Sequence, residues 1–134
     1  MYTVIKEIHF CYGHRLLNHQ GKCRHLHGHN AKAVIRLESE RLDSLGMVCD
    51  FSDIGDYVKD WIDQTLDHRM LLHGDDPVLP LLQEAGEPVY VMQTNPTAEN
   101  IARLIFERVE AGGFPVVEVS IHETDSALAG YRRD

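Results

Sequence analysis

Hydrophobic and polar side chains alternate through two stretches near the start of the chain, residues 4–10 and residues 30–38. Successive side chains of a β-strand point to opposite faces, so this period of two is typical of half-buried strands. Two shorter apolar stretches, residues 89–92 and residues 116–121, predict further strands. The pattern therefore predicts four strands, of which the first two form a hairpin.

Two other segments repeat their apolar residues every three or four positions, which is the period of an amphipathic helix. The first begins near Ser52 or Asp53, both favourable N-cap residues, and continues to about Leu66. The second begins within residues 95–99, where we expect a proline in the first turn, and ends at the glycine pair 112–113. The order strand, strand, helix, strand, helix, strand, paired mainly antiparallel, predicts an α+β fold.

Composition narrows the class of protein. The chain of 134 residues is 43% hydrophobic and 25% charged, which predicts one globular domain over residues 1–134. The net charge of -8 argues against nucleic acid as a partner. Apolar runs are far shorter than the roughly 20 residues that cross a bilayer, and residues 1–7 are too polar for a signal peptide. Three irregularly spaced cysteines suit a reducing compartment, so we expect a cytoplasmic protein without a membrane partner.

Candidate chemistry is concentrated in the segment that joins the first two strands. His27 and His29 lie two positions apart at the start of a strand, so both imidazoles project to one face, and His14 can reach the same point from the neighbouring strand. Three imidazoles without a thiolate describe an open, catalytic zinc site. The alternatives are three unrelated loop histidines, since the chain has nine, or His25 as a competing ligand.

Three further positions carry candidate chemistry. Cys23 is a fourth zinc ligand, a small buried residue, or a nucleophile or base activated by a nearby cation, and its spacing alone does not separate these roles. Asp67 can orient His68, although a helix-capping histidine beside a solvated aspartate explains the pair equally well. Glu123, expected just past the last strand, is either a surface residue or the acceptor of two parallel N–H donors, as on a purine or pterin edge.

Taken together, these motifs resemble the 6-pyruvoyl-tetrahydropterin synthase family, including its bacterial branch of 6-carboxy-tetrahydropterin synthases in queuosine biosynthesis. The resemblance covers nearly the whole chain, and six motifs in family order make it specific. They are Phe10 through His14, Cys23 with His27-Gly28-His29, Asp50-Phe51, Leu66-Asp67-His68, Asn95 through Asn100, and Glu123-Thr124 followed by Tyr131. The cysteine spacing is similar to that of the cysteine-bearing members.

The resemblance implies a role for each candidate. The three histidines of the predicted site would hold zinc, and Cys23 would be the thiolate base. Asp67 and His68 would form the second proton-transfer element. Glu123 would anchor the pterin edge, with Thr97 nearby.

The same resemblance implies a tunnelling fold: a four-stranded antiparallel sheet with two helices packed on one face. Such subunits assemble into barrel-forming homo-oligomers, usually hexamers, with sites at subunit interfaces. The implied function is that of a zinc-dependent 6-carboxy-5,6,7,8-tetrahydropterin synthase acting on 7,8-dihydroneopterin triphosphate, by triphosphate elimination and side-chain cleavage. The alternatives are a 6-pyruvoyl-tetrahydropterin synthase and a non-catalytic oligomeric module that binds a pterin or a metal.

Some residues depart from the family pattern. Tyr12 and Gly13 stand where the family usually has small residues such as Ala-Ala, and Leu72 stands where an asparagine is common. The basic residues closest in sequence to the metal motif are candidates to bind the triphosphate, namely Arg15, Lys22 and Arg24.

Overall fold

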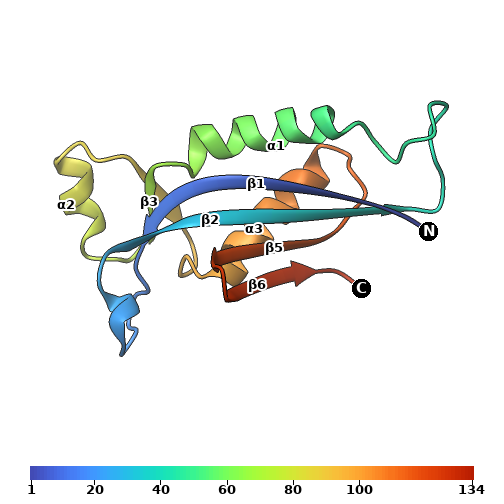
Figure 1. Ribbon diagram of the computed structural model, residues 1–134. Helices are drawn as coiled ribbons and strands as arrows, with labels where there is room; N and C mark the ends of the chain where they lie inside the picture. The colour runs from blue at the N-terminus through green and yellow to red at the C-terminus, as the bar shows by residue number, and fades with distance from the viewer.

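A computed structural model describes residues 1–134 and shows one curled, mixed sheet with three α-helices (Figure 1). The strands lie in the order β4-β3-β1-β2-β5-β6. Their bounds are β1 Tyr2–His14, β2 His27–Ser39, β3 Arg69–His73, β4 Val89–Met92, β5 Val116–Thr124 and β6 Ala127–Arg132. The helices are α1 Phe51–Thr65, α2 Leu79–Glu84 and α3 Ala98–Ala111, with a short 3-10 turn, η1, at Lys22–Arg24.

The centre of the sheet is the long β1–β2 hairpin, whose antiparallel register runs from the pair Tyr2 and Ser39 to the pair His14 and His27. β5 pairs antiparallel with β2, and β6 with β5, whereas β3 pairs parallel with β1 and β4 parallel with β3. The expected four-stranded antiparallel sheet is therefore wrong in strand number and partly in direction. β3 is parallel to β1 because the chain reaches it through α1 and not through a tight turn.

Helices α1 and α3 cover one face of the sheet, as expected, and the main core lies between these layers (Figure 1). Every second residue of the central strands points into it, namely Ile8, Phe10 and Tyr12 of β1, Ala31, Ala33, Ile35 and Leu37 of β2, and Val119 and Ile121 of β5. The helices contribute their apolar stripes, namely Ile54, Val58 and Ile62 of α1 and Ile101, Ile105, Phe106 and Val109 of α3. Burial of these side chains is the main force that holds the helices on the sheet.

The helix ends differ in detail from the expected ones. Asp50 is the N-cap of α1, and its carboxylate accepts a hydrogen bond from the Ser52 amide at 2.8 Å, so the predicted start near Ser52 or Asp53 is slightly late. Thr97 caps α3, which places Pro96 before the cap and not in the first turn. Gly112 ends α3 as predicted. No helix of the chain has the length and apolar character needed to cross a membrane.

Candidate functional site

Three histidines converge where the β1–β2 hairpin reaches its closed end. His14 pairs with His27, and Tyr12 pairs with His29, so strand alternation sends all four side chains to the helix-covered face. The ring centroids are 4.5 Å apart for His14 and His27, 5.0 Å for His14 and His29, and 5.1 Å for His27 and His29. One nitrogen from each ring lies within 4.8 Å of the others, so the hairpin alone assembles this three-histidine cluster.

Backbone carbonyls fix the orientation of two of these rings. His14 Nδ1 lies 2.7 Å from the Pro96 carbonyl oxygen, and His27 Nδ1 lies 2.7 Å from the His25 carbonyl oxygen. A carbonyl only accepts, so both Nδ1 atoms donate and both Nε2 lone pairs remain free, as in a metal-ligating histidine. His25 therefore contributes its backbone, and its ring lies outside the cluster.

The cluster fits a metal ion. His14 Nε2 and His29 Nε2 are only 3.1 Å apart, and His14 Nε2 has no proton because Nδ1 of the same ring donates to Pro96. Two metal–nitrogen bonds of tetrahedral geometry would place such atoms about 3.3 Å apart. Burial lowers the pKa of His14, which keeps its imidazole neutral and able to ligate. Three imidazoles can thus hold a metal ion and leave a position for water or substrate.

A carboxylate and a phenol lie beside the cluster. Glu123 belongs to β5, so the prediction that it follows the last strand is wrong, because β5 continues through Thr124 and β6 follows it. Its two carboxylate oxygens lie 3.8 Å from His14 Nε2 and 3.8 Å from His29 Nε2. The Tyr12 hydroxyl donates a hydrogen bond to Glu123 Oε1 at 2.8 Å. Burial and the adjacent carboxylate raise the pKa of Tyr12, so its hydroxyl remains a donor at neutral pH.

Asp67 and His68 form a separate pair at the end of α1. One Asp67 oxygen accepts the Cys11 amide proton at 2.9 Å, and the other lies 2.7 Å from His68 Nδ1. Burial acts to raise the pKa of the Asp67 carboxyl, but these hydrogen bonds outweigh it and keep the pKa below its usual value. His68 holds a left-handed backbone conformation, with a φ of 57°, that few residues other than glycine adopt. The carboxylate thus orients an exposed imidazole.

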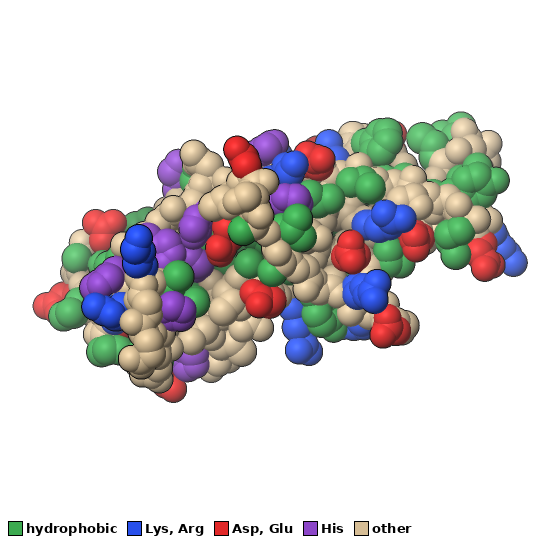
Figure 2. Space-filling model, turned by 60° about the horizontal axis from the view of Figure 1, so that its bottom comes forward, with side chains coloured by type: hydrophobic (Ala, Val, Ile, Leu, Met, Phe, Trp, Pro, Cys, Tyr) green, Lys and Arg blue, Asp and Glu red, His purple; other side chains and the backbone are tan.

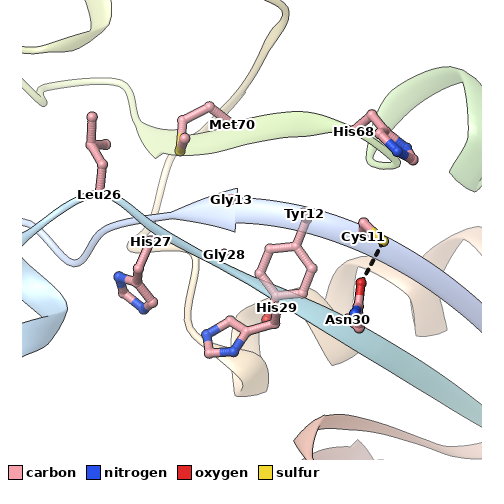
Figure 3. Close-up of a pocket in the computed structure, with 10 residues that line it drawn as sticks. All are labelled: Cys11, Tyr12, Gly13, Leu26, His27, Gly28, His29, Asn30, His68 and Met70. Carbon is pink, nitrogen blue, oxygen red and sulfur yellow. Dashed lines mark hydrogen bonds between the residues drawn. The ribbon is translucent and has the colours of Figure 1, made fainter.

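A pocket of about 440 Å³ is lined by His68 and by residues of the β1–β2 hairpin (Figure 3). Its wall includes His27, His29, His68, Cys11 and Asn30, and the Cys11 thiol donates to Asn30 Oδ1 at 2.8 Å. In Figure 3, His68 lies on one side of the paired strands β1 and β2, and the rings of His27 and His29 lie on the opposite side. No hydrogen bond or ion pair within the chain joins His68 or Asp67 to the three-histidine cluster.

The loop that carries Cys23 is held by a distant part of the chain. Asn95 binds the Leu17 backbone twice, since its Oδ1 accepts the amide proton at 2.8 Å and its Nδ2 donates to the carbonyl at 3.0 Å. The Leu16 amide donates to the Cys23 carbonyl at 2.8 Å, which closes the loop on itself. Cys23 lies half-buried in η1 with a free thiol, outside the group of metal-ligating atoms.

The remaining candidates have visible structural roles. Arg15 forms a bidentate ion pair with Asp76, whose carboxylate is fully buried, so the Arg15 guanidinium is already engaged. This hydrogen bond from Arg15 lowers the pKa of the Asp76 carboxyl. Lys22 and Arg24 flank Cys23 in η1. The Thr97 hydroxyl accepts the Asn100 amide proton at 3.1 Å, and its contact with a pterin stays a prediction.

Tyr12 was expected near the metal as a bulky departure from the family pattern, but its hydrogen bond to Glu123 was not predicted, nor were the contacts of Asn95 and Pro96 with the hairpin. Residues 95–99 were interpreted as the start of a helix and as a family motif, although an asparagine before Pro-Thr is also suited to bind a neighbouring backbone. Histidines gather toward one end of the surface in Figure 2, the end where the hairpin closes, so the sequence cluster is also a spatial one.

Comparison with known proteins places this geometry in a family. The family model for 6-pyruvoyl tetrahydropterin synthase matches residues 3–134, and the chain belongs to this family. Two relatives are named 6-carboxy-5,6,7,8-tetrahydropterin synthase: those of Rickettsia felis and Rickettsia conorii, 41% and 45% identical over 96% of this chain and 98% of their own. The crystal structure of an uncharacterized protein from Wolinella succinogenes matches with a TM-score of 0.84 and 30% identity, over 99% of this chain and 98% of that one.

Proposed function

We propose that the protein is a zinc-dependent 6-carboxy-5,6,7,8-tetrahydropterin synthase that converts 7,8-dihydroneopterin triphosphate. The observation that carries the proposal is the three-histidine cluster with the Glu123 carboxylate beside it. A metal site next to an acceptor for paired N–H donors suits a pterin that carries an oxygenated side chain. The names of the two Rickettsia relatives support the same activity.

His14, His27 and His29 would hold zinc, which as a Lewis acid polarises the oxygen atoms of the substrate side chain. Cys23, as a thiolate, would take a proton from that side chain. The second proton-transfer element is His68: with Nδ1 bound to Asp67, its Nε2 is free to give or receive a proton at the substrate. Glu123 would accept the two N–H donors of the pterin ring, and Thr97 would lie near that ring.

We further propose that the active protein is a homo-oligomer, a hexamer, in the cytoplasm. Within one chain no hydrogen bond or ion pair joins the Asp67–His68 pair to the three-histidine cluster, and in an oligomer a neighbouring subunit would bring a second copy of the pair to it. Strands β4 and β6 are the two edges of the sheet, and unpaired edge strands favour association with further strands. The three free cysteines suit the reducing cytoplasm.

The direct test is incubation of the zinc-loaded protein with 7,8-dihydroneopterin triphosphate, followed by identification of products by mass. We expect 6-carboxy-tetrahydropterin, acetaldehyde and triphosphate. A 6-pyruvoyl product with its side chain retained would identify the other branch of the family. A zinc-loaded oligomer that binds the pterin without turnover would be the non-catalytic module.

Replacing Glu123 by glutamine should weaken substrate capture, because one acceptor oxygen becomes a donor while the shape is kept. Loss of a hydrogen bond to a charged group predicts a rise in KM of roughly 10–100-fold. Steady-state kinetics measure the effect, and zinc content and oligomer size should not change. Glu118→Gln, on the same strand but with an outward side chain, is the matched control. Unaltered kinetics in Glu123→Gln would remove Glu123 from the substrate site.

A further inference from the structure

Tyr12 contacts both the Glu123 carboxylate and the three-histidine cluster. Its hydroxyl donates to Glu123 Oε1 at 2.8 Å, and its ring meets His14 edge-on at a centroid distance of 5.1 Å. The ring centroid of His29 lies 5.7 Å away.

The direction of the Tyr12 hydroxyl is fixed by packing. The side chain is only 3% exposed, and Phe10 stacks on its ring with centroids 5.5 Å apart. A ring held between an aromatic neighbour and two imidazoles has no room to change rotamer. The hydroxyl is therefore a rigid donor at one point.

The Glu123 side chain has no comparable support of its own. It is 25% exposed, and the hydrogen bond from Tyr12 is the only one that its carboxylate makes within the chain. The two histidine nitrogens beside it lie 3.8 Å from its oxygens, beyond hydrogen-bond distance. Without Tyr12, the flexible glutamate would lose conformational entropy each time it met a ligand.

We propose that Tyr12 is a positioning residue that holds the Glu123 carboxylate ready for the paired N–H donors of the pterin ring. The inference rests on the proposed function, since it assigns Glu123 to the substrate. A carboxylate oxygen has two lone pairs, so Glu123 Oε1 accepts from Tyr12 and still receives a ring N–H. Tyr12 thereby acts on substrate capture through Glu123 and takes no part in proton transfer.

The test is Tyr12→Phe, which keeps the buried ring and removes only the hydroxyl. We expect about a tenfold rise in KM for 7,8-dihydroneopterin triphosphate, with kcat changed less than about twofold. The Kd for neopterin, which lacks the triphosphate leaving group, should rise by a similar factor. Zinc content and melting temperature should stay at wild-type values. Tyr57→Phe is the control, because Tyr57 packs on Phe114 away from the site and its hydroxyl makes no hydrogen bond.

The double variant Tyr12→Phe/Glu123→Gln separates positioning from a direct contact with substrate. If Tyr12 acts through Glu123, the double variant should bind neopterin no more weakly than Glu123→Gln alone. Equal effects of Tyr12→Phe in both backgrounds would overturn the proposal, and so would an unchanged KM and Kd in the single variant. A different result would overturn the proposed catalytic function but not the role of Tyr12. In that result the wild-type protein shows no turnover, yet it binds neopterin with an affinity that falls in Tyr12→Phe.

Discussion

Replacing His27 by alanine is expected to abolish most zinc binding, and His29→Ala should do the same. Each change removes one of three imidazoles whose nitrogens lie within 4.8 Å of one another, and two ligands cannot hold the ion as three do. The loss in affinity should exceed the roughly 10–100-fold that follows when only an outer hydrogen-bonding partner is removed. Metal analysis after dialysis against a zinc buffer measures it.

His25→Ala is the matched control for the metal prediction. It alters the same segment and the same residue type, but the contact of His25 with His27 is made by the backbone carbonyl and survives the change. The control should retain about one zinc per chain. Full zinc retention in both His27→Ala and His29→Ala would contradict the assignment, as would a metal held by Cys23 and His25 in place of His14.

Cys23→Ala is expected to lose about 10²–10⁴-fold in turnover while the protein keeps its zinc and its fold. The half-buried thiol lies outside the metal-ligating group, so its removal leaves the three imidazoles in place. Single-turnover kinetics, zinc content and melting temperature measured on one preparation give the three readouts. Cys49→Ala, which alters another half-buried free cysteine, should be active.

The pattern of losses in Cys23→Ala distinguishes its possible roles. If the Cys23 thiolate ligates zinc, its removal should lower both zinc content and melting temperature, since metal binding and folding are coupled at such a site. A fully active Cys23→Ala would show that the thiol has no part in the chemistry. Only loss of turnover with retained zinc supports Cys23 as the base.

The strongly patterned elements were predictable from sequence. Alternation in residues 30–38 identified the buried face of β2, and Thr97 and Gly112 fall inside the predicted limits of α3. β3 was missed because Leu71 and Leu72 are both fully buried, so this short parallel strand has no alternation to detect. β6 was missed because its sequence includes Gly130 and lacks a regular pattern.

The parts of the site that depend on neighbouring residues were predictable, and the contacts between residues far apart in the sequence were not. The spacing of His27 and His29 placed both side chains on one face, because residues two positions apart in a strand point the same way. The hydrogen bond from Tyr12 to Glu123 joins residues 111 positions apart, so no spacing rule could have indicated it. Tyr12 was interpreted as a departure from the family pattern, and only the fold shows that its hydroxyl has a partner.

The contacts made by Asn95 and Pro96 limit how far this metal motif can be moved between proteins. The three histidines lie between residues 14 and 29, yet the Pro96 carbonyl that orients His14 comes from 82 positions away, and the Asn95 side chain that binds Leu17 comes from 78. A peptide of the hairpin alone, or its graft onto another scaffold, would carry all three histidines but not the contacts that fix the tautomer of His14 and the direction of its ring. Transplanting the centre would require the entrance to α3 as well as the hairpin.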